Sequence, residues 1–145
     1  ALAEPGARFL VTDAIYGPTR RFCERTLRQL GCACVFFNPT ADPASLPLEG
    51  ARAIILESPG SLSFEISDTR ALASAARAAG AITVCDNTWS AGVYHHPLDL
   101  GADISVQATT KFISGASDVL GGAVFVRDPA LAERLQACAS DLGYA

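Results

Sequence analysis

The stretch DISVQATTKFISGASDVLGGAVFV, residues 103–126, decides which kind of sheet this chain builds. It contains two short apolar runs, 103–107 and 122–126, joined by small and polar residues without helical periodicity. A crossover between parallel strands normally needs roughly a dozen or more residues, usually as a helix. We therefore predict that the last strand, 122–126, runs antiparallel to its neighbour.

The remaining β-rich runs alternate with helical patterns, which is typical of an α/β domain with a mostly parallel sheet. Their continuous apolar character indicates strands that are buried on both faces. The chain has 145 residues, of which 50% are hydrophobic and 18% charged, and this is enough apolar mass for one core and one domain. The four further strands are expected at 8–12, 33–37, 52–56 and 81–85.

Three helices are expected, and each has a recognisable start. The first begins near Pro18 and stops at Gly31, the second is capped by Ser67 and ends before Gly80, and the third begins at Pro129. The side chains expected to face the core are Phe22, Cys23, Leu27 and Leu30 in the first, Ala71, Leu72, Ala75, Ala76 and Ala79 in the second, and Leu131, Leu135, Cys138 and Leu142 in the third.

The charge balance excludes several classes of partner. Eleven Lys and Arg stand against fifteen Asp and Glu, and the basic residues form no cluster, so we expect no nucleic-acid partner. No apolar run approaches the roughly 18 residues that a membrane span needs, and the N-terminus lacks a signal-peptide pattern. We therefore expect a cytoplasmic protein without a membrane partner.

The sequence predicts no metal site. His95 and His96 are adjacent and cannot form a spaced HxxxH ligand pair, so we interpret them as loop residues. The cysteines are odd in number and form no CxxC pair, and we interpret them as reduced core thiols rather than as disulfides or metal ligands. They are Cys23, Cys32, Cys34, Cys85 and Cys138.

Polar residues follow several of the predicted strands at the point where each strand ends. Tyr16 comes after 8–12, the segment ESPGS after 52–56, Asp86 after 81–85 and Lys111 after 103–107. Ligands of open α/β sheets bind at the carboxyl ends of the strands. One edge of the sheet would therefore gather an aromatic ring, two acids, several hydroxyl groups and one amine.

Lys111 has two interpretations, a surface lysine whose ammonium reaches water or an amine that binds an aldehyde. Few cations accompany it, because residues 78–133 contain only one other lysine or arginine, Arg127. Asp86 follows five uncharged residues and should lie at the lip of the buried sheet, where an acid without a partner is costly. A protonated pyridine nitrogen, which is a cation, would be a suitable partner for the Asp86 carboxylate.

Pyridoxal phosphate is the cofactor that needs this combination of groups. It requires a lysine for its aldehyde, an acid for its ring nitrogen and a site for its phosphate. Thr109 and Thr110 offer hydroxyl and N–H groups for the phosphate, although paired threonines in a loop are also common turn residues. Tyr16 offers a flat ring that could stack on the cofactor.

Three segments of the chain resemble the Cys/Met-metabolism family of pyridoxal-phosphate enzymes. They are VTDAIYGPTRRFC (11–23), ILESPGSLSFE (55–65) and the stretch 84–125, which contains DNTW and QATTK. Within the family, ESPGS and the Trp of DNTW resemble the cystathionine β-lyase members, because the γ-acting members more often show ESPTNP and DNTF.

The resemblance implies a role for each residue at this edge. Lys111 would bind the cofactor's aldehyde and move a substrate proton, Asp86 would pair with the ring nitrogen, Tyr16 would stack on the ring and Thr110 would contact the phosphate. Lys111 and Tyr16 are thus the predicted catalytic residues. The predicted cofactor-binding set is Lys111, Asp86, Tyr16, Thr110, Thr88 and Ala108.

The resemblance also implies a fold and an activity. The fold would be the α/β large domain of the aspartate-aminotransferase type, with a mostly parallel sheet, one antiparallel strand and helices on both faces. The activity would be that of a carbon–sulfur lyase of trans-sulfuration, acting on cystathionine by β-elimination to homocysteine, pyruvate and ammonia. A small sulfur amino acid would be the substrate, and the full-length protein would be a homo-oligomer, a tetramer built from dimers.

Three positions depart from the family pattern. Ala108 stands where the family often has Ser, which removes one hydroxyl from the phosphate site, and Ala116 stands where the segment GHSD has His. Ser61 occupies the position of the Asn in ESPTNP, which speaks against γ-chemistry. We also expect residues 1–145 to be an incomplete large domain, without the upstream phosphate loop and the C-terminal small domain, and inactive by itself.

Two further classes of function stay open at this point. The first is another enzyme of trans-sulfuration, a cystathionine γ-synthase or γ-lyase. The second is a non-catalytic module, either a nucleotide-binding domain or an assembly domain with this fold. The segment TDAIYGPT has one glycine where the GxGxxG dinucleotide motif needs three, which counts against nucleotide binding.

Overall fold

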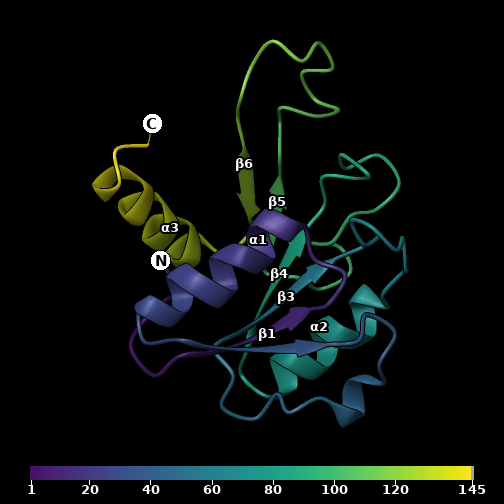
Figure 1. Cartoon of the computed structure of the whole chain (residues 1–145), viewed down its shortest axis with the longest axis vertical. Helices are drawn as coiled ribbons and strands as arrows, with labels where there is room; N and C mark the ends of the chain where they lie inside the picture. The colour runs from purple at the N-terminus through teal and green to yellow at the C-terminus, as the bar shows by residue number, and fades with distance from the viewer. Residues whose placement is uncertain (145) are drawn as a thin grey trace.

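The computed structural model describes residues 1–144, and they build one six-stranded sheet with the order β2-β1-β3-β4-β5-β6 (Figure 1). The pairs from β2 to β5 are parallel, and β6 is antiparallel to β5, which confirms the prediction for the last strand. The strands are β1 Arg8–Thr12, β2 Ala33–Phe37, β3 Ala53–Glu57, β4 Ile82–Asp86, β5 Ile104–Gln107 and β6 Ala123–Val126.

Strands β3 and β4 each begin and end one residue later than the sequence predicts. The acids that were expected just beyond these strands are therefore their last residues. In the parallel ladder between them, Glu57 lies opposite Asp86. The two carboxyl side chains consequently project on the same face of the sheet at its carboxyl edge.

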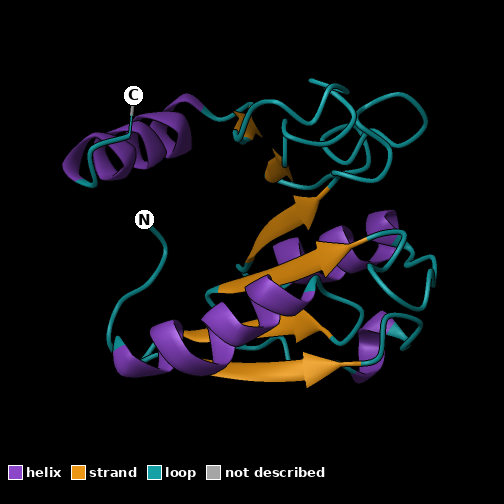
Figure 2. Ribbon diagram, turned by 45° about the horizontal axis from the view of Figure 1, so that its top comes forward, coloured by secondary structure: helices purple, strands orange, loops and turns teal. Residues whose placement is uncertain are grey.

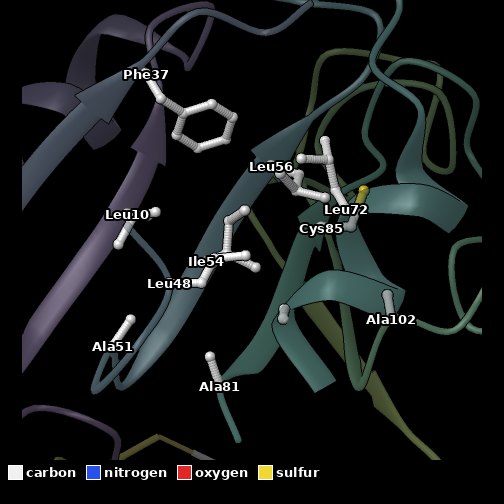
Figure 3. Packing of buried hydrophobic residues seen from close by; sticks show 11 residues of the cluster. Leu10, Phe37, Leu48, Ala51, Ile54, Leu56, Leu72, Ala81, Cys85 and Ala102 are labelled. Carbon is white, nitrogen blue, oxygen red and sulfur yellow. The ribbon is translucent and has the colours of Figure 1, made fainter. Parts of the chain in front are cut away.

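Helices cover both faces of the sheet, as predicted (Figure 2). One face is covered by α1, Gly17–Phe22, and its π-helical continuation Cys23–Leu27; the other is covered by α2, Thr69–Ala78. A short 3-10 turn, Pro43–Ser45, contacts α2. The core under α2, shown in Figure 3, comprises Leu10, Phe37, Leu48, Ala51, Ile54, Leu56, Leu72, Ala76, Ala81, Cys85 and Ala102.

The first helix buries only half of its predicted inner face. Cys23 and Leu27 are buried, but Phe22 and Leu30 are 49% and 52% exposed. Phe22 immediately precedes Cys23 and so lies about 100° away around the helix axis. Leu30 follows the π-helical segment, whose wider turn rotates the residues after it out of the predicted stripe.

The prediction of Ser67 as the cap of α2 is wrong, because the cap is Asp68. The Asp68 carboxylate accepts a hydrogen bond of 2.9 Å from the backbone N–H of Ala71. A charged acceptor at this position satisfies one of the free N–H groups of the first turn. Ser67 lies one residue earlier, and its own N–H donates to Ser58 Oγ at 3.1 Å.

The prediction that the third helix buries an apolar face is also wrong. Helix α3, Pro129–Asp141, starts at the predicted proline, but none of its residues is buried. Leu131, Leu135 and Cys138 are half-buried, and Leu142 is exposed. Among the described elements, α3 contacts only β6, whose Val124 and Phe125 are exposed. Strand β2, at the other edge, is likewise not buried along its length, so burial on both faces holds only for the central strands.

The cysteines are free thiols in the structure, as predicted. Cys23, Cys32 and Cys85 are buried, and burial raises the pKa of the Cys85 thiol to about 12. Within residues 1–144 no three His, Cys, Asp or Glu side chains gather as a metal site. None of the described helices has the length and hydropathy required to cross a membrane.

Replacing Leu72 by alanine tests the core under α2. Leu72 is 1% exposed, so Leu72→Ala should lower the free energy of unfolding by about 2 to 5 kcal/mol. Leu142→Ala is the matched control, because the same atoms are removed at a position that is 69% exposed, and it should change stability by less than about 0.5 kcal/mol. Urea unfolding measures both, and equal losses would contradict the packing described above.

Candidate cofactor site

A cavity of about 480 Å³ opens at the carboxyl edge of the sheet, where β1, β3, β4 and β5 end. It collects five of the six predicted site residues, and Thr110 is the one that lies outside it. The prediction that Tyr16, Asp86 and Lys111 gather at one edge of the sheet is thus confirmed. The residues that line the cavity are Tyr16, Gly17, Pro18, Glu57, Ser61, Leu62, Asp86, Thr88, Trp89, Ala108, Lys111 and Phe112.

Asp86 is held in place by hydrogen bonds from Thr88. Its Oδ1 accepts from the Thr88 N–H at 3.0 Å and from Thr88 Oγ1 at 2.6 Å. Thr88 Oγ1 in turn accepts from the N–H of Ala108 at 2.9 Å, which ties the end of β4 to the end of β5. Within residues 1–144 no cationic side chain lies within ion-pairing distance of Asp86.

Lys111 lies in the turn that follows β5, and its backbone N–H donates to the carbonyl of Ala108 at 3.1 Å. Its Nζ lies 5.9 Å from the centroid of the Tyr16 ring. Tyr16 precedes α1 and is partly exposed, with its ring at the cavity. In the part of the chain that the structure describes, no acid pairs with Lys111. The amine and the aromatic ring therefore share one open space.

Glu57 is a residue of this site to which the sequence assigned no role. Its side chain is 4% exposed, its Oε2 accepts from the N–H of Tyr16 at 2.6 Å, and its Oε1 accepts from Ser61 Oγ at 2.5 Å. Burial raises the pKa of Glu57, and the nearby Asp86 carboxylate raises it further. The available signal was its place directly after the apolar residues of β3, which is the same signal that identified Asp86.

The loops that follow β1 and β3 are docked against each other beside the cavity. The N–H of Ser61 donates to the carbonyl of Ala14 at 2.9 Å. A Cβ on Gly60 would lie 2.5 Å from the Cβ of Ala14, so only glycine allows this approach. The docking brings the Ser61 hydroxyl and the Tyr16 backbone to the same carboxylate, that of Glu57.

Trp89 lines the cavity and lies between two other aromatic rings. Its ring centroid lies 5.3 Å from that of Phe64, edge to face, and 6.3 Å from that of Phe112. The loop that carries Trp89 is closed by His95, whose Nδ1 and Nε2 lie 3.1 Å from Asn87 Oδ1 and 3.2 Å from Thr69 Oγ1. His95 is thus a loop residue, as predicted, with a structural contact on each ring nitrogen.

Thr110 uses its hydroxyl within its own loop. Its Oγ1 accepts from the N–H of Gly121 at 2.9 Å and lies 3.2 Å from the carbonyl of the same residue, to which it can donate. It lines a neighbouring recess that also includes Lys111, Ser117 and Asp118. The contact of Thr110 with the phosphate stays a prediction. Lys111 lines both this recess and the cavity described above.

A lysine, an acid and an aromatic ring around one cavity at the carboxyl edge of an α/β sheet are the groups that a pyridoxal-phosphate enzyme requires. The family model described as "Cys/Met metabolism PLP-dependent enzyme" matches residues 1–145, and the chain therefore belongs to this family. The family's cofactor is pyridoxal phosphate.

Relatives with several activities match the chain. It is 44% identical to a cystathionine beta-lyase of Bordetella avium over 99% of this chain and 36% of the relative. It is 37% identical to an L-alanine/L-glutamate racemase of Wolbachia pipientis over 84% of this chain and 30% of the relative. The crystal structure of a cystathionine gamma-lyase from Lactobacillus plantarum superposes with a TM-score of 0.91 at 29% identity, over 97% of this chain and 37% of that one. The chain thus spans about a third of the length of these relatives.

The residues of the cavity fit pyridoxal phosphate. Its volume of about 480 Å³ lies within the range of about 300 to 1,000 Å³ that is usual for small-molecule sites. Asp86 and Lys111 each lack an ionic partner among residues 1–144, and these are the two groups whose partners the cofactor would supply. The Tyr16 ring is free to cover one face of it.

Protonation of His95 should weaken the fold in mildly acidic solution. Burial lowers the pKa of His95 below its usual 6.5, and the adjacent His96 lowers it further. The unfolded chain therefore binds this proton first, so stability is complete above about pH 6.5 and is lost as the pH falls towards the lower pKa of the folded state.

Chemical unfolding at a series of pH values measures this effect. His95→Gln should flatten the loss between pH 6.5 and pH 5, whereas His96→Gln, at the exposed neighbouring position, should keep most of it. A loss of the same size in His95→Gln and in the wild type would refute the assignment to His95.

Proposed function

We infer that this chain is the cofactor-binding part of a carbon–sulfur lyase that cleaves cystathionine by β-elimination to homocysteine, pyruvate and ammonia. The observation that carries the proposal is the shared cavity of Lys111, Asp86 and Tyr16. Relatives named as cystathionine beta-lyases support the substrate, and so does Ser61, which replaces the Asn of the γ-acting members.

When bound, pyridoxal phosphate supplies an aldehyde that joins covalently to amines and a protonated ring that accepts the electrons left by a departing Cα proton. Lys111 would hold the aldehyde through Nζ and, once the substrate amine has replaced it there, would take the Cα proton. No acid among residues 1–144 pairs with Lys111, so no ion pair holds its Nζ away from the aldehyde.

Asp86 and Tyr16 would orient the ring between them. The Asp86 carboxylate, fixed by the two hydrogen bonds from Thr88, would keep the ring nitrogen protonated. Tyr16 would cover one flat face and exclude water from it. Thr88 and Ala108 also line the cavity, and Thr110 remains the proposed contact of the phosphate.

A homo-oligomer is the proposed form of the working protein. Several large apolar side chains that line the cavity or contact its lining are exposed, which is typical of a surface that another chain or segment covers. They are Leu62, Phe64, Trp89 and Phe112.

Reduction of the holoprotein with borohydride should label Lys111. It is the only lysine in these 145 residues, so peptide mapping by mass spectrometry has one lysine in this region to find. Lys111→Arg should abolish both the label and the visible absorbance of the bound cofactor while leaving the thermal unfolding unchanged. A cofactor label at any other residue would refute the assignment of Lys111.

Loss of the Asp86 carboxylate should stop the elimination. Asp86→Asn keeps an oxygen for the Thr88 hydrogen bonds but loses the charge, and it should lower kcat for pyruvate release from cystathionine by roughly a hundredfold or more. Asp141→Asn, at an exposed position on α3, is the matched control and should keep full activity.

The products of the same assay identify the reaction. Homocysteine and pyruvate are expected for β-elimination. Cysteine and 2-oxobutyrate would show γ-elimination instead, the activity named for the Lactobacillus plantarum structure.

A further inference from the structure

We propose that Glu57 is a positioning residue of the cofactor site: its carboxyl group joins the backbone of Tyr16 to the hydroxyl of Ser61 and thereby fixes the Tyr16 ring against the bound cofactor. This inference rests on the cofactor lying in the cavity between Tyr16 and Asp86, as proposed above. It assigns a role to a carboxyl group that the elimination itself does not use.

The burial of Glu57 is the first argument. It is the only carboxyl side chain among the buried residues of the described chain, in a core otherwise made of apolar and small polar groups. Burying a carboxyl group costs free energy unless hydrogen bonds compensate, so a purely structural position would be better filled by an apolar residue. Glu57 therefore marks a position where its two oxygens are needed.

The partners of those oxygens are the second argument. Oε2 accepts from the backbone N–H of Tyr16 at 2.6 Å and Oε1 accepts from Ser61 Oγ at 2.5 Å, so each oxygen holds a different loop. The N–H of Tyr16 lies directly at the Cα from which the ring projects. A shift of this anchor moves the whole ring relative to Lys111 Nζ, which lies 5.9 Å from its centroid.

The third argument is the position of Glu57 in the sheet. It is the last residue of β3, a central strand with parallel neighbours on both sides, and it lies opposite Asp86. A rigid strand holds its terminal side chain more firmly than a loop does. The pair of strands β3 and β4 therefore fixes both acids. These are Asp86, which is expected at the nitrogen of the cofactor ring, and Glu57, which holds the Tyr16 ring in place.

Two substitutions at position 57 distinguish a role for the hydrogen bonds of the carboxyl group from a role for its negative charge. Glutamine at position 57 can accept from the Tyr16 N–H and donate to Ser61 Oγ, so Glu57→Gln should bind pyridoxal phosphate within about threefold of the wild type. Glu57→Ala loses both contacts and should bind it about 10- to 100-fold more weakly. Glu49→Ala is the matched control, because Glu49 is exposed and its side chain makes no hydrogen bond within residues 1–144.

Binding is measured in the protein that carries this chain by titrating the cofactor-free form with pyridoxal phosphate. The readouts are the quenching of Trp89, which lines the cavity, and the visible circular dichroism of the bound cofactor, which should change when the surroundings of its ring change. Thermal unfolding of each variant is recorded alongside. If Glu57→Ala fails to fold, Ser61→Ala, which removes one arm of the contact, should weaken binding by about 3- to 10-fold.

A double substitution tests whether Glu57 acts through Tyr16. In a Tyr16→Leu background, Glu57→Ala should change the binding of pyridoxal phosphate by less than about threefold, because the ring that it positions is gone. If the losses of affinity from the two substitutions were additive, the proposal would be overturned. Equal losses of affinity in Glu57→Gln and Glu57→Ala would also overturn it, because they would show a role for the charge. If Tyr16→Leu alone had no effect, the cofactor would lie elsewhere, and both this inference and the proposed site would fall.

Discussion

Glu57 and Asp86 lie opposite each other where β3 and β4 end, and the parallel ladder that pairs these strands sets the geometry of the whole site. In a parallel sheet every strand delivers its last residues to the same edge, so residues distant in sequence meet without long connections. The side chains of a strand alternate between its faces. A slip of one residue in β4 would turn Asp86 to the opposite face and remove it from the cavity that Lys111 lines.

Much of the sheet could be predicted from the sequence, because buried parallel strands are short apolar runs bounded by turn residues. The helices were harder, and α3 shows why. The spacing of Leu131, Leu135 and Cys138 correctly identifies an apolar stripe, but no pattern within the chain says whether another element covers it. The phase shift that exposes Leu30 has a similar origin, because a π-helical turn leaves little trace in the spacing of apolar residues.

The candidate site, like the fold, could be predicted only in part from the sequence. The rule that ligands bind at the carboxyl ends of strands was enough to bring Tyr16, Asp86 and Lys111 together, because it depends only on where strands end. The hydrogen bonds of individual side chains could not be predicted in this way. Thr110 turns its hydroxyl to the backbone of Gly121, and Glu57 reaches the N–H of Tyr16, and both choices depend on how loops pack in three dimensions.

Two carboxyl groups, those of Glu57 and Asp86, line the same cavity as one lysine and would repel each other if both were charged. Their burial and their hydrogen-bond partners differ. Glu57 is buried, and this burial together with the nearby Asp86 raises its pKa, so it retains a proton more readily than an exposed glutamate does. Asp86 is only half-buried and receives both of its hydrogen bonds from Thr88, one from an N–H and one from an O–H. Asp86 is thus the acid that a cationic ring would meet, whereas both oxygens of Glu57 are already engaged by Tyr16 and Ser61. Glu57 can then act through the position of its oxygens, without competing for the same cation.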